Sequence, residues 1–180
     1  MQKLRQELAQ TYGYEPTHKI TLRLVDKETM TKRTGSPLVQ GCMLYNRNST
    51  VITKPSPAIS IISKRKTVQE VKIQHQCTIY LRNTLTIDDL SHVLVHELTH
   101  DYLFHHIGEP TDPLVNEGIC EAVSGAWLLK HGFKQQFEAK KENPLTEYGG
   151  GFRKMYPQLK RYGFKMMLEK NKHHFKPFSD

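Results

Sequence analysis

The sequence contains few cysteines and no long apolar segment. Its three cysteines, Cys42, Cys77 and Cys120, form no Cys-x-x-Cys pair, which excludes a zinc ribbon or a thioredoxin-type site. No segment approaches the roughly 18 apolar residues of a membrane-spanning helix, and the N-terminal segment MQKLRQELAQTYGY lacks the apolar core of a signal peptide. These absences predict a cytoplasmic protein with reduced, buried thiols.

The chain is strongly basic, with a formal net charge of +8. Its basic residues concentrate in Lys64–Lys66 and Arg153–Lys176. Such charge attracts nucleic acid, but a solvated surface explains it more simply because no RNP, zinc-finger or phosphate-loop motif is present. Nucleic acid is therefore a candidate partner but not the favoured one, and the sequence leaves the oligomeric state open. A length of 180 residues predicts one domain over 1–180, mainly strands over 1–85 and mainly helices over 86–180.

The most informative motif is the run His96-Glu97-Leu98-Thr99-His100. On a helix, residues i and i+4 lie one turn apart on the same face, so two imidazole nitrogens can converge on one metal ion. Glu97 lies about 100° further round the helix, which keeps it out of the coordination position but within reach of a water on the metal. This spacing is typical of a general base in metal-assisted hydrolysis.

A second run, Asn116–Glu121 with the sequence NEGICE, supplies what the first motif lacks. A catalytic zinc site takes three protein ligands and keeps one position open, and Glu117 is the candidate third ligand. Glu121 follows one turn later and is expected to contact His96, because metal-bound imidazoles usually donate their other N–H to a carboxylate or carbonyl. Cys120 is expected to point away from the face that Glu117 and Glu121 share.

Both motifs lie in predicted helices. Thr86 and Asp89 form a capping-box pattern before the first helix, which Gly108 and Pro110 end. Its apolar stripe consists of Ile87, Leu90, Val93, Leu94 and Leu98. The second helix begins at the N-cap Asp112, with Pro113 at its first position, and ends at Gly132. The metal is therefore expected between two helices.

The sequence before residue 86 predicts mainly strands. The clearest is Val71–Leu81, whose apolar residues alternate with polar ones; His75 on its apolar side is expected to be a satisfied or edge histidine rather than a ligand. Short apolar runs at 42–45, 51–52 and 58–62 are separated by loops, and Thr31–Pro37 has turn chemistry. Leu4, Leu8 and Tyr12 share one face of a short docking helix.

After the motifs, residues 134–144 form a charged surface segment, and a last helix over Pro157–Lys170 packs on the core. Strands followed by helices predict an α+β fold: a mixed or antiparallel N-terminal sheet, then the active-site helix, the Glu-bearing helix and the C-terminal helices.

The motifs HELTH and NEGICE resemble those of the gluzincin zinc metallopeptidases. With the runs Ala126–Leu128, Tyr148–Arg153 and Arg161–Gly163, they are closest to the C-terminal peptidase domain of the plant DA-one family, over roughly Ile87 to the C-terminus. The resemblance implies a zincin-like fold, zinc ligands at His96, His100 and Glu117, and Glu97 as base. It also nominates Val71–Leu81, or a neighbouring strand, as the edge that binds extended substrate.

Two departures limit that resemblance. The paired carboxylates of the plant EEGIC motif are Asn116-Glu117 here. No LIM module or ubiquitin-interacting helix precedes the domain in the sequence. The plant substrates and the regulation by ubiquitin are therefore not expected to carry over.

The predicted reaction is peptide hydrolysis with one Zn²⁺ per chain and a protein or peptide substrate. Glu97 takes the water proton and later delivers it to the leaving amine. Tyr148 is the leading candidate for stabilising the oxyanion, because three glycines follow it and let the backbone approach the cleft. Other candidates are Arg153, Tyr156, Tyr162, His105 and His106. His92 is expected to lie near the site without being a fourth ligand.

Two other functions stay open. A DNA-associated metallopeptidase of the SprT-like kind would fit HExxH with positive charge, but its third ligand is usually histidine, whereas NEGICE offers Glu117. A non-catalytic, metal-stabilised binding module would have no use for Glu97.

Overall fold

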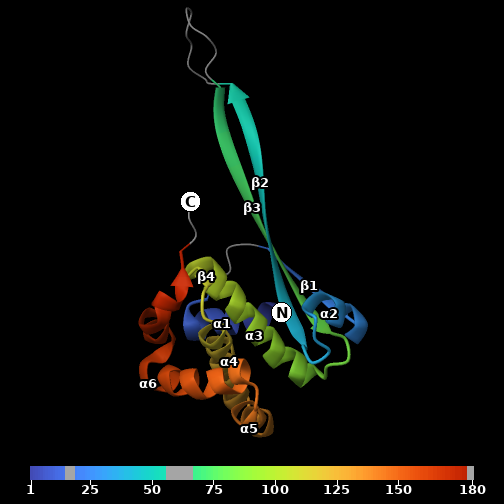
Figure 1. The fold of residues 1–180 in the computed structure, drawn as a ribbon, viewed down its shortest axis with the longest axis vertical. Coiled ribbons are helices and arrows are strands. Elements are labelled where there is room, and N and C mark those ends of the chain that lie inside the picture. Colours follow the sequence, from blue (N-terminus) through green and yellow to red (C-terminus); the bar gives the residue numbers. More distant parts are fainter. Residues whose placement is uncertain (15–18, 56–66, 178–180) are drawn as a thin grey trace, which may run out of the picture.

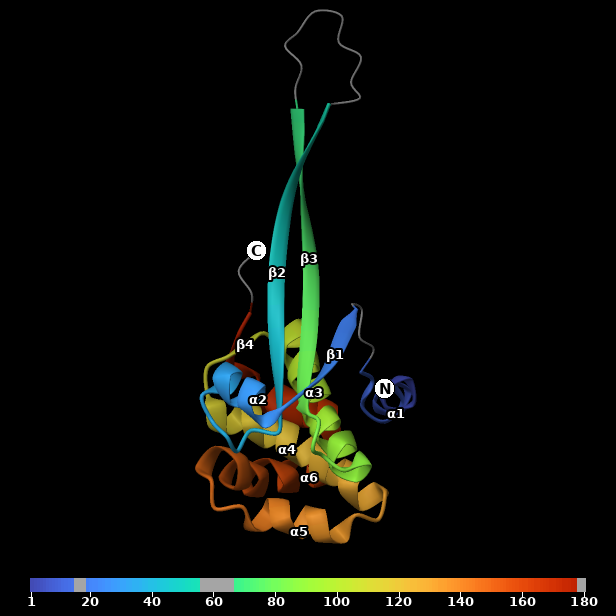
Figure 2. The ribbon, with the colours of Figure 1, turned by 90° about the vertical axis from the view of Figure 1, so that its right-hand side faces the viewer.

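The computed structural model describes residues 1–14, 19–55 and 67–177, with the backbone alone for 46–55 and 67–75 (Figures 1 and 2). Within these ranges, six α-helices and a small mixed sheet form an α+β fold, which confirms the predicted class. The helices gather at one end, and two long strands extend from them as a ribbon (Figure 1). None of the described helices is both long and apolar enough to cross a membrane.

The sheet contains β1 (Ile20–Val25), β2 (Gly41–Pro55) and β3 (Thr67–Arg82) in the order β1-β3-β2. β1 runs parallel to β3, and β2 runs antiparallel to it. The runs predicted at 42–45 and 51–52 are one strand rather than two, because every residue of β2 has a partner in β3. The predicted run at 58–62 and the side chain of His75 lie outside the described residues.

A helix lies where the sequence predicted a turn. α2 (Lys27–Thr34) begins at Asp26, whose carboxylate accepts from Thr29 N at 2.7 Å, and ends at Gly35, whose φ is 73°. Only Met30 of this short, polar helix is buried, so its apolar periodicity is too weak to be read from the sequence. α2 packs on β3 and places the Arg33 guanidinium 4.0 Å from the ring centre of Tyr80. Tyr80 is therefore buried, although strand alternation placed it on the polar face.

The predicted N-terminal docking helix is confirmed as α1 (Gln2–Tyr12), with Leu8 buried. The Glu7 carboxylate joins this helix to the end of α4 (Pro113–Lys130). It accepts from Trp127 Nε1 at 3.1 Å and lies 2.7 Å from Lys130 Nζ. His131 Nε2 lies 2.8 Å from the same carboxylate. One acid thus holds α1 against the helix that carries NEGICE.

The caps of both motif helices are confirmed. α3 (Ile87–His106) begins at Thr86, whose Oγ1 accepts from Asp89 N at 3.2 Å. α4 begins at Asp112, whose carboxylate accepts from Leu114 N at 3.0 Å. The expectation that Ile87 belongs to the buried stripe is wrong, because this first residue of α3 is 84% exposed. Between the helices, β4 (Glu109–Pro110) pairs with β5 (Phe175–Lys176) and fixes the C-terminal segment.

The segment predicted as charged surface forms α5 (Lys134–Glu142), which buries Phe137. A π-helical turn, η1 (Thr146–Gly150), then leads into α6 (Gly151–Asn171). α6 starts six residues earlier than predicted and contains Pro157, and it kinks at Gly163, where φ is 74°. A 3₁₀ turn, η2 (Lys172–His174), connects α6 to β5.

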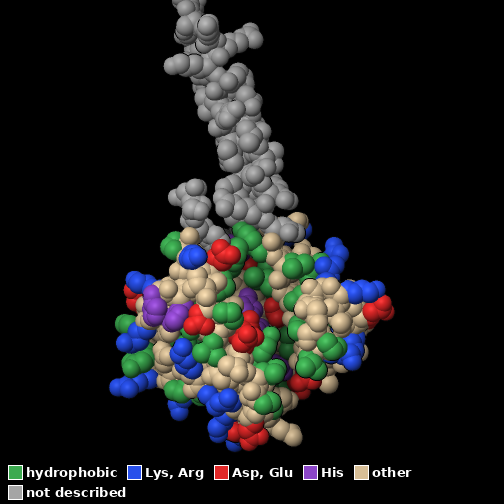
Figure 3. Space-filling model, in the orientation of Figure 1, with side chains coloured by type: hydrophobic (Ala, Val, Ile, Leu, Met, Phe, Trp, Pro, Cys, Tyr) green, Lys and Arg blue, Asp and Glu red, His purple; other side chains and the backbone are tan. Residues whose placement is uncertain are grey.

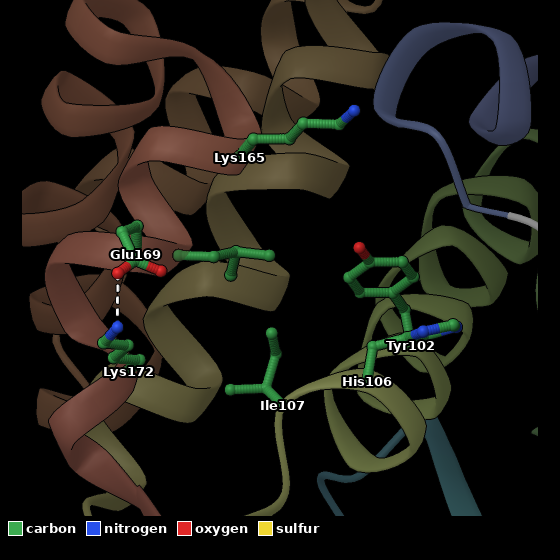
Figure 4. A pocket seen from close by; sticks show the side chains of 7 residues that line it. Tyr102, His106, Ile107, Lys165, Glu169 and Lys172 are labelled. Atoms are coloured by element: carbon green, nitrogen blue, oxygen red, sulfur yellow. Dashed lines mark hydrogen bonds and ion pairs between the residues drawn. The ribbon is translucent and has the colours of Figure 1, made fainter.

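A cavity of about 330 Å³ lies between the C-terminal part of α3 and α6 (Figure 4). The Lys165 ammonium and the Tyr102 hydroxyl extend toward it from these two helices, and Lys172 turns away to pair with Glu169. Ile107 and Leu168 contribute its apolar wall. None of its lining residues belongs to the two motifs.

Candidate metal centre

Helices α3 and α4 bring the predicted ligands together. His96 Nε2 and His100 Nε2 lie 3.0 Å apart, as expected for residues one turn apart on α3. The Glu117 carboxylate of α4 faces both rings, with Oε2 3.2 Å from His96 Nε2 and Oε1 3.4 Å from His100 Nε2. Two imidazole nitrogens and a carboxylate thus converge on one small volume between the helices.

These separations fit the donor set of a metal ion. Donors held about 2.0–2.1 Å from zinc in a tetrahedron lie roughly 3.3 Å from one another. The distance between the two Nε2 atoms and the distance from each of them to the Glu117 carboxylate lie in the range 3.0–3.4 Å. Glu117 Oε2 is buried and has no hydrogen-bond partner among the described residues. A buried carboxylate oxygen without a donor is costly, and a bound cation would remove that cost.

Cys120 offers an alternative third donor, which corrects the expectation that it points away. Its Sγ lies within 4.8 Å of donor atoms of His96 and His100. The physical reason is that residues i and i+3 share a helix face, so Cys120 lies beside Glu117. Burial, with the nearby Glu117, Glu97 and Glu121 carboxylates, raises the pKa of the Cys120 thiol well above its usual range. The Glu117 oxygens lie 3.2 and 3.4 Å from the two Nε2 atoms, so we favour Glu117 as the third donor.

Each imidazole has a partner on its outer nitrogen. His96 Nδ1 lies 2.8 Å from Glu121 Oε1; the distance is that of an ion pair, but the angle is not that of a hydrogen bond. Glu121 Oε2 accepts from Lys140 Nζ on α5 at 2.7 Å. His100 Nδ1 lies 3.2 Å from Asn116 Nδ2, and an amide flip would present the Asn116 oxygen to an Nδ1–H instead. Sequence reasoning missed Asn116 and Lys140 as partners of the site.

The electrostatic field of the site favours a cation. Burial opposes a charged imidazole, but Glu117 and Glu121 raise the pKa of His96 to about 10. Burial likewise favours a neutral Glu117, yet His100 and His96 hold the pKa of that carboxyl well below its usual range. Against burial, Lys140 and His96 lower the pKa of Glu121 to about 2. The two carboxylates therefore stay ionised and attract either a proton or a metal ion to the imidazoles.

Glu97 lies on the side of α3 that faces the sheet and is 4% exposed. A Cβ on Gly41, the first residue of β2, would lie 2.8 Å from Glu97 Oε1 and 2.6 Å from Val93 Cγ1. The absence of a side chain at Gly41 therefore makes room for this carboxylate, which sequence reasoning did not foresee. Burial raises the pKa of Glu97, against the lowering influence of His96 and His100. A carboxylate with a raised pKa accepts a proton more readily.

The π-helical turn η1 places Tyr148 over the site. Its ring lies 6.3 Å from that of His96, inclined by 24°. Burial raises the pKa of Tyr148, and so do the nearby carboxylates of Glu117, Glu97 and Glu121. Its phenol therefore stays a hydrogen-bond donor. π-Helical turns often occur at functional sites.

The glycines around Tyr148 allow close packing of backbones. A Cβ on Gly151 would lie 2.7 Å from Gly118 Cα, so the start of α6 touches α4 one residue after Glu117. A Cβ on Gly149 would lie 1.8 Å from the Asn143 carbonyl oxygen. The sequence predicted that these glycines bring the backbone close to the site. In the structure they bring α6 close to α4, where Gly151 packs on Gly118.

The other candidate donors have different surroundings. Arg153 donates to the carbonyl oxygens of Lys141 at 2.8 Å and Asn143 at 3.1 Å, and Tyr156 stacks on Phe152. Tyr162 packs beside Lys170, His105 contacts Asp101, and His106 stacks on Tyr102. His92 is partly buried next to Asp89, with Nε2 3.6 Å from Asp89 Oδ1. Of these candidates, Tyr148 lies beside His96, one of the predicted metal ligands.

The edge strand nearest the site is β2. Beside Glu97, β3 is paired on both of its sides. Leu81 of β3 is opposite Leu24 of β1 on one side and Gly41 of β2 on the other. Val71–Leu81 is thus not the open edge beside the site, and the neighbouring strand β2, which pairs with no other described strand, takes that place. On the face shown in Figure 3, acidic and histidine side chains appear near the centre, and lysine and arginine lie mainly around the border.

Comparisons of the chain with protein-family models, curated proteins and solved structures return no match. The two motifs and the geometry of the site are therefore the basis for any function assigned to this chain.

Proposed function

We propose that this protein is a zinc-dependent peptidase with a gluzincin-like site. The observation that carries the proposal is the convergence of His96 Nε2, His100 Nε2 and the Glu117 carboxylate within 3.0–3.4 Å, with one Glu117 oxygen buried and without a donor. Two imidazoles and a carboxylate suit zinc better than magnesium or calcium, which prefer oxygen ligands. When bound, zinc would acidify a water and polarise the scissile carbonyl.

The side chains around the ligands divide the remaining work. Glu97 accepts the water proton at its carboxylate and returns it to the leaving amine. Tyr148 donates its hydroxyl proton in a hydrogen bond to the carbonyl oxygen as negative charge develops there. Glu121 and Asn116 hold the two imidazoles so that both Nε2 atoms face the site.

The same geometry favours the gluzincin-like proposal over the two alternatives. A third ligand of carboxylate type, one helix after HExxH, is the gluzincin arrangement and differs from the histidine of the SprT-like kind. A purely structural zinc site needs no further buried carboxylate. Here Glu97, next to His96 in the chain, is buried, and the absence of a side chain at Gly41 leaves room for its carboxylate. The closer likeness to the plant DA-one peptidase domain is part of this proposal and concerns the peptidase domain alone.

The test combines metal analysis with an unbiased peptide-library digest by the purified full chain. We expect about one zinc per chain and cleavage that a chelator removes and added zinc restores. Glu97→Gln keeps the size of the side chain but cannot take the water proton, so it should retain zinc and lose at least about 10²-fold in kcat.

Glu138→Gln is the matched control, because Glu138 is an exposed acid that pairs only with Lys141 in the described residues. It should cleave like the parent. Cleavage by Glu97→Gln at the parental rate would refute the mechanism. Binding to DNA with a steep salt dependence, without peptide cleavage, would favour the SprT-like alternative.

A further inference from the structure

Lys140 has an unusual environment for a lysine on a short helix. Its side chain on α5 is 12% exposed, whereas that of its neighbour Lys141 is 57% exposed. Lys140 Nζ lies 2.7 Å from Oε2 of Glu121, which is itself 8% exposed. Burying an ammonium is costly unless it is paired, so this contact accounts for the position of the side chain.

The Glu121 carboxylate uses its two oxygens for two different partners. Oε1 lies 2.8 Å from His96 Nδ1, and Oε2 accepts from Lys140. With one oxygen on each partner, the plane of the carboxylate is fixed from both ends. We propose that Lys140 is a positioning residue: it holds Glu121, and through Glu121 it orients the His96 ring so that Nε2 faces the other ligands.

The chain of contacts runs across three helices. Lys140 belongs to α5, Glu121 to α4 and His96 to α3, so no single helix fixes the imidazole by local geometry. If Lys140 is removed, Glu121 Oε2 loses its only described hydrogen-bond donor and the carboxylate can rotate away from His96. No local pattern indicates this role, because Lys140 lies 19 residues from Glu121 in a run of charged residues.

A plain structural role makes a different prediction. An ion pair that merely fastens α5 to α4 would change the stability of the protein when removed, but not its zinc affinity. A positioning role requires that the effect of Lys140 on zinc affinity pass through Glu121. The inference builds on the proposed function only as far as zinc binding, and it does not depend on peptide cleavage.

The experiment is a double-mutant cycle on the full chain. The variants are Lys140→Met, Glu121→Gln and the double variant, with Lys140→Arg as the conservative change and Lys141→Met as the matched exposed control. Zinc affinity is measured by competition with a chelator of known affinity, and Tm is measured for each protein. We expect Lys140→Met and Glu121→Gln each to weaken zinc binding about 10-fold, the lower end of the range for groups that orient metal ligands.

The zinc affinity of the double variant should equal that of the single variant with the lower affinity, since both changes break the same chain of contacts. Lys140→Arg should restore most of the affinity, and Lys141→Met should leave it unchanged. The proposal would be overturned if Lys140→Met bound zinc with the parental affinity, or if the losses of the two single variants added in the double variant. This holds even if the Tm of Lys140→Met is lower than that of the parent. Coupled losses in a protein that cleaves no peptide would support the role of Lys140 and refute the peptidase instead. A parent chain that binds no zinc would refute both.

Discussion

The two faces of α3 both bury charged groups, but their hydrogen-bonding partners differ. On one face, Asp101 is fully buried and accepts from the Tyr14 hydroxyl, with His105 Nδ1 3.4 Å from its carboxylate. Cys77 also hydrogen-bonds to Asp101. On the other face, the Nε2 atoms of His96 and His100 and the Glu117 carboxylate converge within 3.0–3.4 Å. Donors surround the acid on the first face, whereas on the second face Glu117 Oε2 is buried and makes no hydrogen bond among the described residues.

Burial alone therefore does not identify a site. A buried carboxylate that finds its donors within the protein holds elements together, as Asp101 does for α3, β3 and the segment after α1. A buried carboxylate oxygen that lacks a donor, such as Glu117 Oε2, indicates a ligand.

The largest effect is expected from Glu117, the proposed third ligand. Glu117→Ala should weaken zinc binding by more than about 10²-fold, beyond the range for groups that only orient ligands. Cys120→Ser should stay close to the parental affinity, because the Glu117 carboxylate faces both Nε2 atoms and supplies the proposed third donor. Chelator competition measures both. If Cys120→Ser loses the metal and Glu117→Ala keeps it, the donor set is His96, His100 and Cys120, and the gluzincin-like proposal fails.

A smaller loss, in kcat alone, is expected from Tyr148→Phe. Removing one oxyanion donor costs about 10²-fold, and the ring that packs beside His96 is retained. Zinc affinity and Tm should therefore match those of the parent. Tyr162→Phe is the control, since Tyr162 is 38% exposed and packs beside Lys170. Equal kcat values for Tyr148→Phe and the parent would leave Tyr148 a packing residue.

The sequence was a good guide to the parts of the site that local rules control. The caps Thr86 and Asp112 and the i, i+4 spacing of the histidines are local signals, and they predicted both motif helices. Glu117 and Glu121 were placed by the same helical spacing. The fold class followed from the order of strands and helices, although α2 was read as a turn because only Met30 marks its buried side.

The rest of the site depends on contacts between distant segments, which no local pattern encodes. Lys140 reaches Glu121 from α5, and Gly41 makes room for Glu97 from the start of β2. Tyr80 is buried by a helix that the sequence did not reveal. Cys120 was misjudged for a simpler reason, because its i+3 relation to Glu117 was overlooked.

A change on the face of α3 that carries Asp101 should lower the stability of the protein and leave its zinc affinity unchanged. Asp101→Asn keeps the shape of the side chain but loses a charged acceptor for the Tyr14 hydroxyl, at a cost of about 1–3 kcal/mol. For a chain of this size, that corresponds to a fall in Tm of roughly 2–12 °C. Asp88→Asn, at an exposed position of the same helix, is the control. A loss of zinc affinity in Asp101→Asn would break the contrast between the two faces.

The smallest effect concerns His92, one turn before His96 on the metal-facing side. Its side chain is 12% exposed, and its buried Nδ1 has no hydrogen-bond partner among the described residues. Burial, followed by the charge of Lys140, lowers the pKa of His92 to about 4, against the opposing influence of Asp89 and Glu121. The ordinary value for histidine is 6.5. His92 is therefore neutral in the folded protein at pH values where it is protonated in the unfolded chain.

The sign of the pH effect follows from this difference in proton binding. The stability that a neutral His92 contributes is fully present above about pH 6.5 and is lost as the pH falls through about 4. His92→Gln removes that titration and leaves every other group in place. Between pH 7.5 and pH 4.5, with a chelator present throughout, the Tm of the parent should fall a few degrees further than that of His92→Gln. Equal falls would mean that His92 is already solvated or protonated in the folded protein, and that the metal-facing side of α3 is less tightly closed than the other.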